Sequence, residues 1–381
     1  MRAFTLPLVE CLATAHGPIR VRQGQLIRLF SDDGYRGQGE ATPLAEFGTE
    51  DGPASRRALA RGIEDLIAAG SFSLEDGLAL IWKSASHSPC ARAALDSALH
   101  DLAAQEMEQP LSTWLHMHSG LAGRPASRVA VQAIVSGGEP ESVWSSAERL
   151  VAEGFDAFKL KLATNPDGRG LEADLARVAA LRDCIGSERR IRLDANEAWT
   201  FPEAMAALDS LACYSIDFVE QPVPRHELMN LRELDRCAAI PVAADEALLG
   251  SGWSACLESR SASIFVVKPS ALGGIRPALA LASRARSLGI RVIWSSLIDG
   301  AVSRAVGVVL AAGLGSEGEV HGLGTAGLLA RDLVDPVTPN VDPQHGSILL
   351  RKSNGLDCAL GDLVDEDSEI WGELRLFERR S

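Results

Sequence analysis

Short apolar runs recur along the middle of the chain, and several of them end in a charged side chain. Segments with apolar positions at helical spacing separate them. Strands that alternate with helices in this way predict a parallel sheet joined by crossover helices. The predicted strands are residues 129–135, 155–161, 190–196, 216–222, 240–246, 264–269, 290–296 and 319–323.

Eight such strands within about 200 residues match the size of a (β/α)8 barrel. We therefore predict an α/β protein in which residues 126–334 form a (β/α)8-type (TIM-like) barrel. Residues 1–125 lack this period and predict an N-terminal α+β capping domain of three helices and a few strands, completed by residues 335–381. The predicted cap elements are strand 26–30, a hairpin turn at Asp32-Asp33-Gly34, strand 35–41, and helices 54–69 and 89–105.

The composition of the chain argues against several classes of function. The net charge of −14 argues against a nucleic-acid surface, which needs clustered basic residues. No apolar run reaches the length of a membrane helix, and the seven scattered cysteines form no C-x-x-C pair. We expect a cytoplasmic protein that acts on a small-molecule carboxylate, without nucleic-acid or membrane partners, and the sequence leaves a homo-oligomer open.

Three acidic residues, Asp194, Glu220 and Asp245, end three successive predicted strands. Converging carboxylates repel each other and raise each other's pKa unless a cation neutralises them. An all-oxygen set favours Mg2+ over zinc, so we predict a magnesium site. The alternative is that these residues face solvent, as acidic residues at the ends of barrel strands often do.

Three lysines lie at the ends of flanking strands. Lys159 and Lys161 are two residues apart on one strand and therefore point the same way. Near a cation an ammonium is driven toward its neutral form, as a general base requires. Lys268 ends the sixth strand and is placed to face Lys161 across a substrate. The alternative is that the lysines only form structural pairs with the carboxylates.

Weaker signals concern substrate contacts. Gly273-Gly274-Ile275 opens a predicted helix, whose backbone N–H groups can hold an anion. We therefore list Ser270, Ser296 and Gly273 as candidate substrate-binding residues. The cap loops around residues 16–20 and 45–50 are expected to close over the barrel mouth, and Asp299 is expected to be a simple loop carboxylate.

Taken together, the strand ends resemble the muconate-lactonising branch of the enolase superfamily, which has an α+β cap before its barrel. This resemblance implies removal of a proton α to a carboxylate. Lys161 would be the base, Mg2+ on the three carboxylates would hold the enediolate, and Lys159 would lie beside the substrate carboxylate. The motifs are Lys159-Leu160-Lys161, Leu193-Asp194-Ala195-Asn196, Val219-Glu220-Gln221-Pro222, Ala244-Asp245-Glu246 and Val267-Lys268-Pro269-Ser270.

Within that branch, further stretches of the chain resemble the corresponding stretches of the o-succinylbenzoate synthases. These are lyases (hydro-lyases) of menaquinone biosynthesis that dehydrate 2-succinyl-6-hydroxy-2,4-cyclohexadiene-1-carboxylate by syn elimination. Lys161 would make both proton transfers, and Lys268 would stay protonated and stack on the substrate ring. The similar stretches are residues 37–44, Ser295-Ser296-Leu297, residues 321–325 and residues 328–333, whereas Ile298-Asp299 departs from the synthase pattern.

Other functions remain open at this point. An N-acylamino acid racemase of the same superfamily would use Lys161 and Lys268 as a two-base pair. A dipeptide epimerase is less favoured, because similar epimerases often carry an Asp on strand eight for the substrate ammonium, where this chain has glycine in residues 321–325. A barrel that binds a metal and a ligand without catalysis would not need both lysines.

Overall fold

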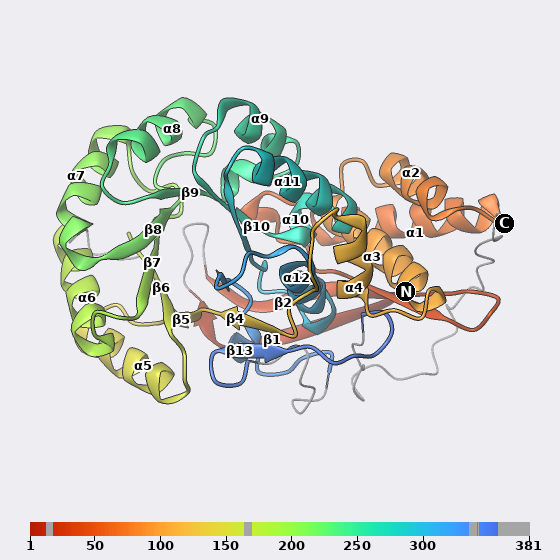
Figure 1. The fold of residues 1–381 in the computed structure, drawn as a ribbon, viewed down its shortest axis with the longest axis horizontal. Coiled ribbons are helices and arrows are strands. Elements are labelled where there is room, and N and C mark those ends of the chain that lie inside the picture. Colours follow the sequence, from red (N-terminus) through yellow and green to blue (C-terminus); the bar gives the residue numbers. More distant parts are fainter. Residues whose placement is uncertain (13–17, 164–169, 335–340, 342, 357–381) are drawn as a thin grey trace.

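The computed structural model describes residues 1–12, 18–163, 170–334, 341 and 343–356. Figure 1 shows a curved parallel sheet flanked by helices beside a smaller part with an antiparallel sheet. Among the described residues, no helix has the length and apolar character needed to cross a bilayer. Most of the tail predicted to complete the cap, including residues 357–381, lies outside the described residues.

The predicted barrel is confirmed. Seven strands pair in parallel in the order β11-β10-β9-β8-β7-β6-β5. A bridge from Ser295 to Gly322 links the end of β11 to β12, and β12 pairs in parallel with β4. All eight predicted strands are present, although the first is divided at Gln132 into β4 and β5. The bounds are β4 (Arg128–Val131), β5 (Ala133–Val135), β6 (Ala157–Lys161), β7 (Arg190–Asp194), β8 (Ile216–Glu220), β9 (Val242–Ala244), β10 (Ile264–Val267), β11 (Arg291–Trp294) and β12 (Val320–His321).

Helices cover the outside of this sheet (Figure 1). Local sequence fixes where they begin: α7 starts with a capping box in which the Thr200 backbone N–H donates to Glu203 at 2.8 Å. The bounds are α5 (Pro140–Ala152), α6 (Gly170–Ile185), α7 (Phe201–Leu211), α8 (Leu228–Cys237), α9 (Gly252–Ser259), α10 (Pro269–Leu272), α11 (Ile275–Ser287) and α12 (Ala301–Leu314).

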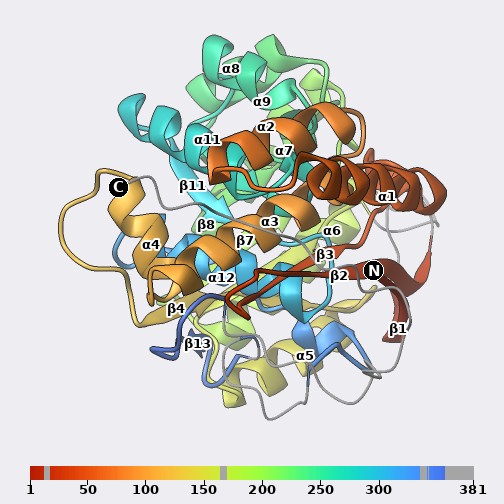
Figure 2. The ribbon, with the colours of Figure 1, turned by 90° about the vertical axis from the view of Figure 1, so that its right-hand side faces the viewer.

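The N-terminal part is an antiparallel sheet of order β1-β2-β3 with helices packed on it (Figure 2). The hairpin turn is confirmed, with Gly34 at φ 87°. The structure adds β1, a longer β2 and a fourth helix to the predicted elements. The bounds are β1 (Arg2–Leu12), β2 (Ile19–Phe30), β3 (Arg36–Ala41), α1 (Gly52–Ala69), α2 (Leu74–Ser84), α3 (Pro89–Glu106) and α4 (Leu111–His118).

Helix α3 joins the cap to the barrel. It lies so close to β3 that a Cβ on Gly39 would sit 1.9 Å from the Ala94 carbonyl oxygen. On its other side, Asp96 accepts hydrogen bonds from the first backbone N–H groups of α11. The described part of the tail reaches both regions: β13 (Ser347–Leu349) pairs with β4, and the Leu356 N–H donates to Asp101 on α3 at 2.7 Å. The domain boundaries stay predictions.

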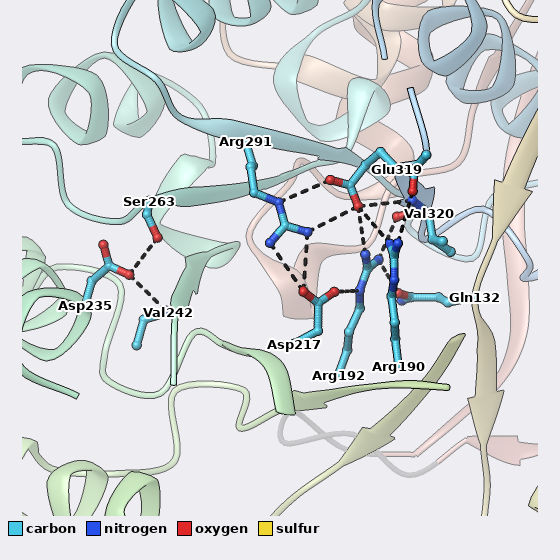
Figure 3. Close-up of polar contacts among 11 residues, drawn as sticks. Gln132, Arg190, Arg192, Asp217, Asp235, Val242, Ser263, Arg291, Glu319 and Val320 are labelled. Carbon is cyan, nitrogen blue, oxygen red and sulfur yellow. Dashed lines mark hydrogen bonds and ion pairs between the residues drawn. The ribbon is translucent and has the colours of Figure 1, made fainter. Parts of the chain in front are cut away.

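A ring of alternating charges lies near the amino-terminal ends of the barrel strands (Figure 3). The fully buried Arg192 donates to Asp217 at 2.8 Å and to Glu319 at 3.0 Å. Arg291 donates to the same two carboxylates. Burial raises the pKa of Asp217, but the charges and hydrogen bonds of Arg192 and Arg291 together outweigh it and hold the pKa below its usual value. The ring therefore stays ionised at neutral pH.

We expect Arg192→Met to lower the free energy of unfolding by about 3–5 kcal/mol, because it removes one partner of buried charges. Arg190→Met is the matched control: Arg190 approaches the same Glu319 at 3.9 Å, but its side chain is 44% exposed, so a loss below about 1 kcal/mol is expected. Urea unfolding followed by circular dichroism measures both. Equal losses in the two variants would contradict the assignment of the ring as a buried structural network.

Candidate active site

A pocket opens at the carboxyl ends of the barrel strands, beneath the cap. Side chains from β6, β7, β9–α9, β10, β11 and β12 line its barrel side, and residues 12, 19, 44, 46 and 47 line its cap side. Of the predicted site residues, it brings together Lys159, Lys161, Asp194, Asp245, Lys268 and Ser296.

The three acidic residues lie at the carboxyl ends of three adjacent strands. Asp194 and Glu220 are direct neighbours in the register of β7 and β8, and Asp245 follows β9. All three are at most 3% exposed. Burial, together with the charges of Asp194 and Asp245, raises the pKa of Glu220 to about 8 despite the opposing charge of Lys159. Burial likewise raises the pKa of Asp245. Burial therefore favours the protonated form of two of the three carboxyl groups.

Two of the lysines form ion pairs with these carboxylates. The Lys159 Nζ lies 2.8 Å from both Asp194 and Glu220, and Lys268 contacts Asp245. Among the residues that the structure describes, no three His, Cys, Asp or Glu side chains already converge as a metal site. Lys159 and Lys268 contact the carboxylate oxygens instead. The donor set nevertheless fits a hard divalent cation, because it offers only carboxylate oxygens.

The lysines differ in their electrostatic surroundings. Burial lowers the pKa of Lys161, and the charges of Lys159 and Lys268 add to this effect while Asp194 opposes it. Burial also acts on Lys268, but Asp245 and Glu220 outweigh it and raise the pKa. Within the described part of the chain, no acidic side chain forms an ion pair with Lys161. One lysine is thus biased toward the neutral form and the other toward the cation.

The structure does not bring Ser270 or Gly273 to the pocket. The Ser270 hydroxyl donates to Asp299 at 3.2 Å. A Cβ on Gly273 would lie 2.2 Å from the Arg92 guanidinium, so this residue faces α3. The N–H groups at the start of α11 already donate to Asp96, and this internal carboxylate takes the place of the predicted substrate anion.

Asp299 is not a simple loop carboxylate, because only 2% of it is exposed. It accepts from the Leu297 N–H at 3.0 Å and thereby orders the loop after β11. Nearby, Glu40 of the cap accepts from the Gly300 and Ser303 N–H groups at the start of α12. Arg22 of β2 donates to the Ile298 carbonyl at 3.3 Å. Buried charged side chains of the cap therefore bind the segment that follows β11.

The pocket contains residues that sequence reasoning missed. Asn196 donates to Glu246 at 3.2 Å, and both line the pocket beside the carboxylates. Their positions, two residues after Asp194 and one residue after Asp245, were a usable signal. The sequence gives no comparable signal for Gln132, because this residue stands at an interruption of the first barrel strand. From the cap, the Phe47 ring lies 4.4 Å from the Lys268 Nζ, as the expected closure by residues 45–50 implies. Residues 16 and 17 lie outside the described residues.

Comparison with known proteins identifies the family. Residues 142–360 match the enolase C-terminal domain-like family, and residues 6–115 match the mandelate racemase/muconate lactonizing enzyme N-terminal domain. The chain belongs to the enolase superfamily and, within it, to the muconate-lactonising branch, which confirms the predicted family.

Individual relatives differ in their activities. A hydrophobic dipeptide epimerase of Enterococcus faecalis is 28% identical over 82% of this chain and 85% of its own. An o-succinylbenzoate synthase of Thermobifida fusca is 30% identical over 100% of this chain and 96% of its own. An N-succinyl-L-Arg/Lys racemase of Bacillus cereus is 25% identical over 80% of both chains. The crystal structure of the Enterococcus faecalis dipeptide epimerase with Mg and L-Leu-L-Tyr superposes with a TM-score of 0.82 at 26% identity, covering 93% of this chain and 97% of that one.

The Glu40 carboxyl predicts a pH-dependent stability. Burial, with the charge of Asp299, raises its pKa to about 7 in the folded protein, from 4.5 as the ordinary value. Between these pH values the folded state binds more protons than the unfolded state, so stability falls as pH rises. We expect Glu40→Gln to remove up to about 3 kcal/mol of this fall. Urea unfolding of both proteins from pH 4.5 to 8 measures it, and parallel curves would refute the assignment.

Proposed function

We propose that the chain catalyses a Mg2+-dependent reaction that begins with removal of a proton α to a carboxylate. Asp194, Glu220 and Asp245 would hold the metal ion. Mg2+ bound there supplies positive charge that stabilises the negative charge left when the proton departs. Lys159 and Lys268 would then withdraw their ammonium groups from the carboxylates and turn them toward the substrate.

Lys161 is assigned as the base. It lines the pocket without an ion pair, and burial lowers its pKa, so it can accept a proton near neutral pH. Lys159 stays protonated, because Asp194 and Glu220 outweigh the effect of burial and raise its pKa. It therefore acts as a cation beside the substrate carboxylate, and Ser296 remains a candidate substrate contact.

The specific activity that we propose is o-succinylbenzoate synthase, a lyase of menaquinone biosynthesis. The observation that carries it is the setting of Lys268: its raised pKa keeps it cationic, and it already lies over an aromatic ring, that of Phe47, at 4.4 Å. A substrate ring in this place would receive the same cation–π contact. The Thermobifida fusca synthase, which matches over the whole chain, adds support.

An N-succinylamino acid racemase is the second candidate. Both lysines line one pocket, as a two-base reaction requires, and the Bacillus cereus racemase is a relative. A dipeptide epimerase is less favoured although such enzymes are among the relatives. Among the described residues, the pocket wall from β11 and β12 carries no carboxylate for an ammonium and consists of Ser295, Ser296, Leu297, Ile298, Gly322, Gly324 and Thr325.

The metal assignment predicts that Asp245→Asn weakens Mg2+ binding at least tenfold, since one anionic ligand is lost. Isothermal titration calorimetry with MgCl2 measures this directly. Asp209→Asn, at an exposed position of α7, is the matched control and should bind Mg2+ like the wild type. Unchanged affinity in Asp245→Asn would remove this residue from the ligand set.

The catalytic assignment predicts that Lys161→Ala has less than about 1% of wild-type turnover while Lys83→Ala, at an exposed position of α2, is unaffected. Two assays run in parallel with Mg2+: dehydration of 2-succinyl-6-hydroxy-2,4-cyclohexadiene-1-carboxylate by absorbance, and racemisation of an N-succinyl amino acid by optical rotation. Fast dehydration with slow racemisation supports the synthase. Fast racemisation alone would replace it with the racemase.

Lys268→Arg separates the two roles of this lysine. If Lys268 only supplies a cation, arginine keeps the charge and part of the dehydration rate should survive. If Lys268 is a second base, racemisation of one antipode should vanish, because arginine does not give up its proton in proteins. The same two assays measure both effects.

A further inference from the structure

Gln132 lines the pocket from the barrel side. It stands between β4 and β5, and only 5% of it is exposed. Its backbone is fixed, because its N–H donates to the His321 carbonyl at 2.9 Å. The side chain is therefore held at one position in the barrel interior.

The orientation of the Gln132 amide is also fixed. Its Oε1 accepts a hydrogen bond from the Arg192 Nη1 at 2.8 Å, and the same nitrogen donates to the Val320 carbonyl at 2.7 Å. A guanidinium can only donate, so the amide oxygen must face Arg192. The amide nitrogen consequently faces the other way. Reversing the amide would bring two donors together and leave both without an acceptor.

Arg192 cannot easily turn aside, because the charge ring holds it (Figure 3). Its remaining N–H groups donate to Asp217 and Glu319, and its guanidinium lies 4.7 Å from the Phe218 ring. The network thus ends in one oriented amide beneath the pocket.

The Gln132 Nε2 has no hydrogen-bond partner among the described residues. Beside it, Gly322 packs closely: a Cβ there would lie 3.4 Å from this nitrogen and 2.6 Å from the Ser295 hydroxyl oxygen, so a side chain at this position would crowd the amide. Ser295 and Gly322 line the same pocket. A nearly buried N–H donor without a protein acceptor is costly unless a ligand or water supplies one.

We propose that Gln132 is a substrate-binding residue that donates a hydrogen bond to an acceptor oxygen of the substrate. This inference rests on the proposed function and deepens it. Because the donor cannot be reversed, the substrate must carry a carbonyl, carboxylate or hydroxyl oxygen there, and an ammonium group is excluded from this position.

Two variants separate binding from structure. Gln132→Glu keeps an acceptor for Arg192 and so preserves the network, but it replaces the N–H donor with a second oxygen. Gln132→Met has similar length and offers neither group. We expect KM to rise about tenfold in Gln132→Met and further in Gln132→Glu, where two oxygens repel, with kcat changed less than about threefold. Gln132→Glu should keep the wild-type melting temperature.

The measurement uses whichever of the two substrates above the wild-type enzyme converts, with Mg2+. Gln23→Glu, at an exposed position of β2, controls for the added charge and should leave KM unchanged. A KM within twofold of wild type in Gln132→Glu, with defects confined to Gln132→Met and accompanied by a lower melting temperature, would show a purely structural role and overturn the inference. Conversion of neither substrate by the wild type would instead overturn the proposed function, and this inference with it.

Discussion

Repulsion among the buried carboxylates at the ends of three adjacent strands governs how the charged side chains are arranged at the barrel mouth. Two unit charges about 4 Å apart repel by about 4 kcal/mol at the effective dielectric constant of a protein site. Asp194, Glu220 and Asp245 cannot all remain ionised there without cations. The lysines that flank them are therefore counterions as well as candidate catalysts. The carboxylates raise the pKa of Lys159, whereas burial and the charges of Lys159 and Lys268 lower that of Lys161.

The barrel interior has two charged layers with opposite character. In the lower layer, two arginines and two carboxylates pair in a closed ring, and the pKa values of Asp217 and Glu319 are lowered. Such a layer needs no ligand. In the upper layer, burial raises the pKa values of Glu220 and Asp245 despite the opposing charges of Lys159 and Lys268. A balanced network is expected of a structural element and an unbalanced one of a site that binds a cation.

Sequence reasoning found what depends on local pattern. Strand period and strand-end charges are local, so the eight barrel strands and the residues at their ends were predictable. The amide of Gln132 and the environment of Asp299 depend on Arg192 and Ser270, which lie far away in sequence. Gly273 shows the limit most directly: its position before a helix suggested an anion site, but Asp96 from the cap already satisfies that helix.

The charged groups of the pocket and part of its apolar lining come from different parts of the molecule. The charged groups lie on barrel strands, whose register fixes their spacing. Leu12, Ile19 and Phe47, in contrast, come from the cap and present apolar surface to the same pocket. The two parts are joined by buried charges, because Glu40 caps α12 and Arg22 holds the loop at Ile298. The cap therefore contributes apolar surface to the pocket while the barrel strands supply its charged groups, and Phe47 joins the two sets where its ring lies 4.4 Å from the Lys268 Nζ.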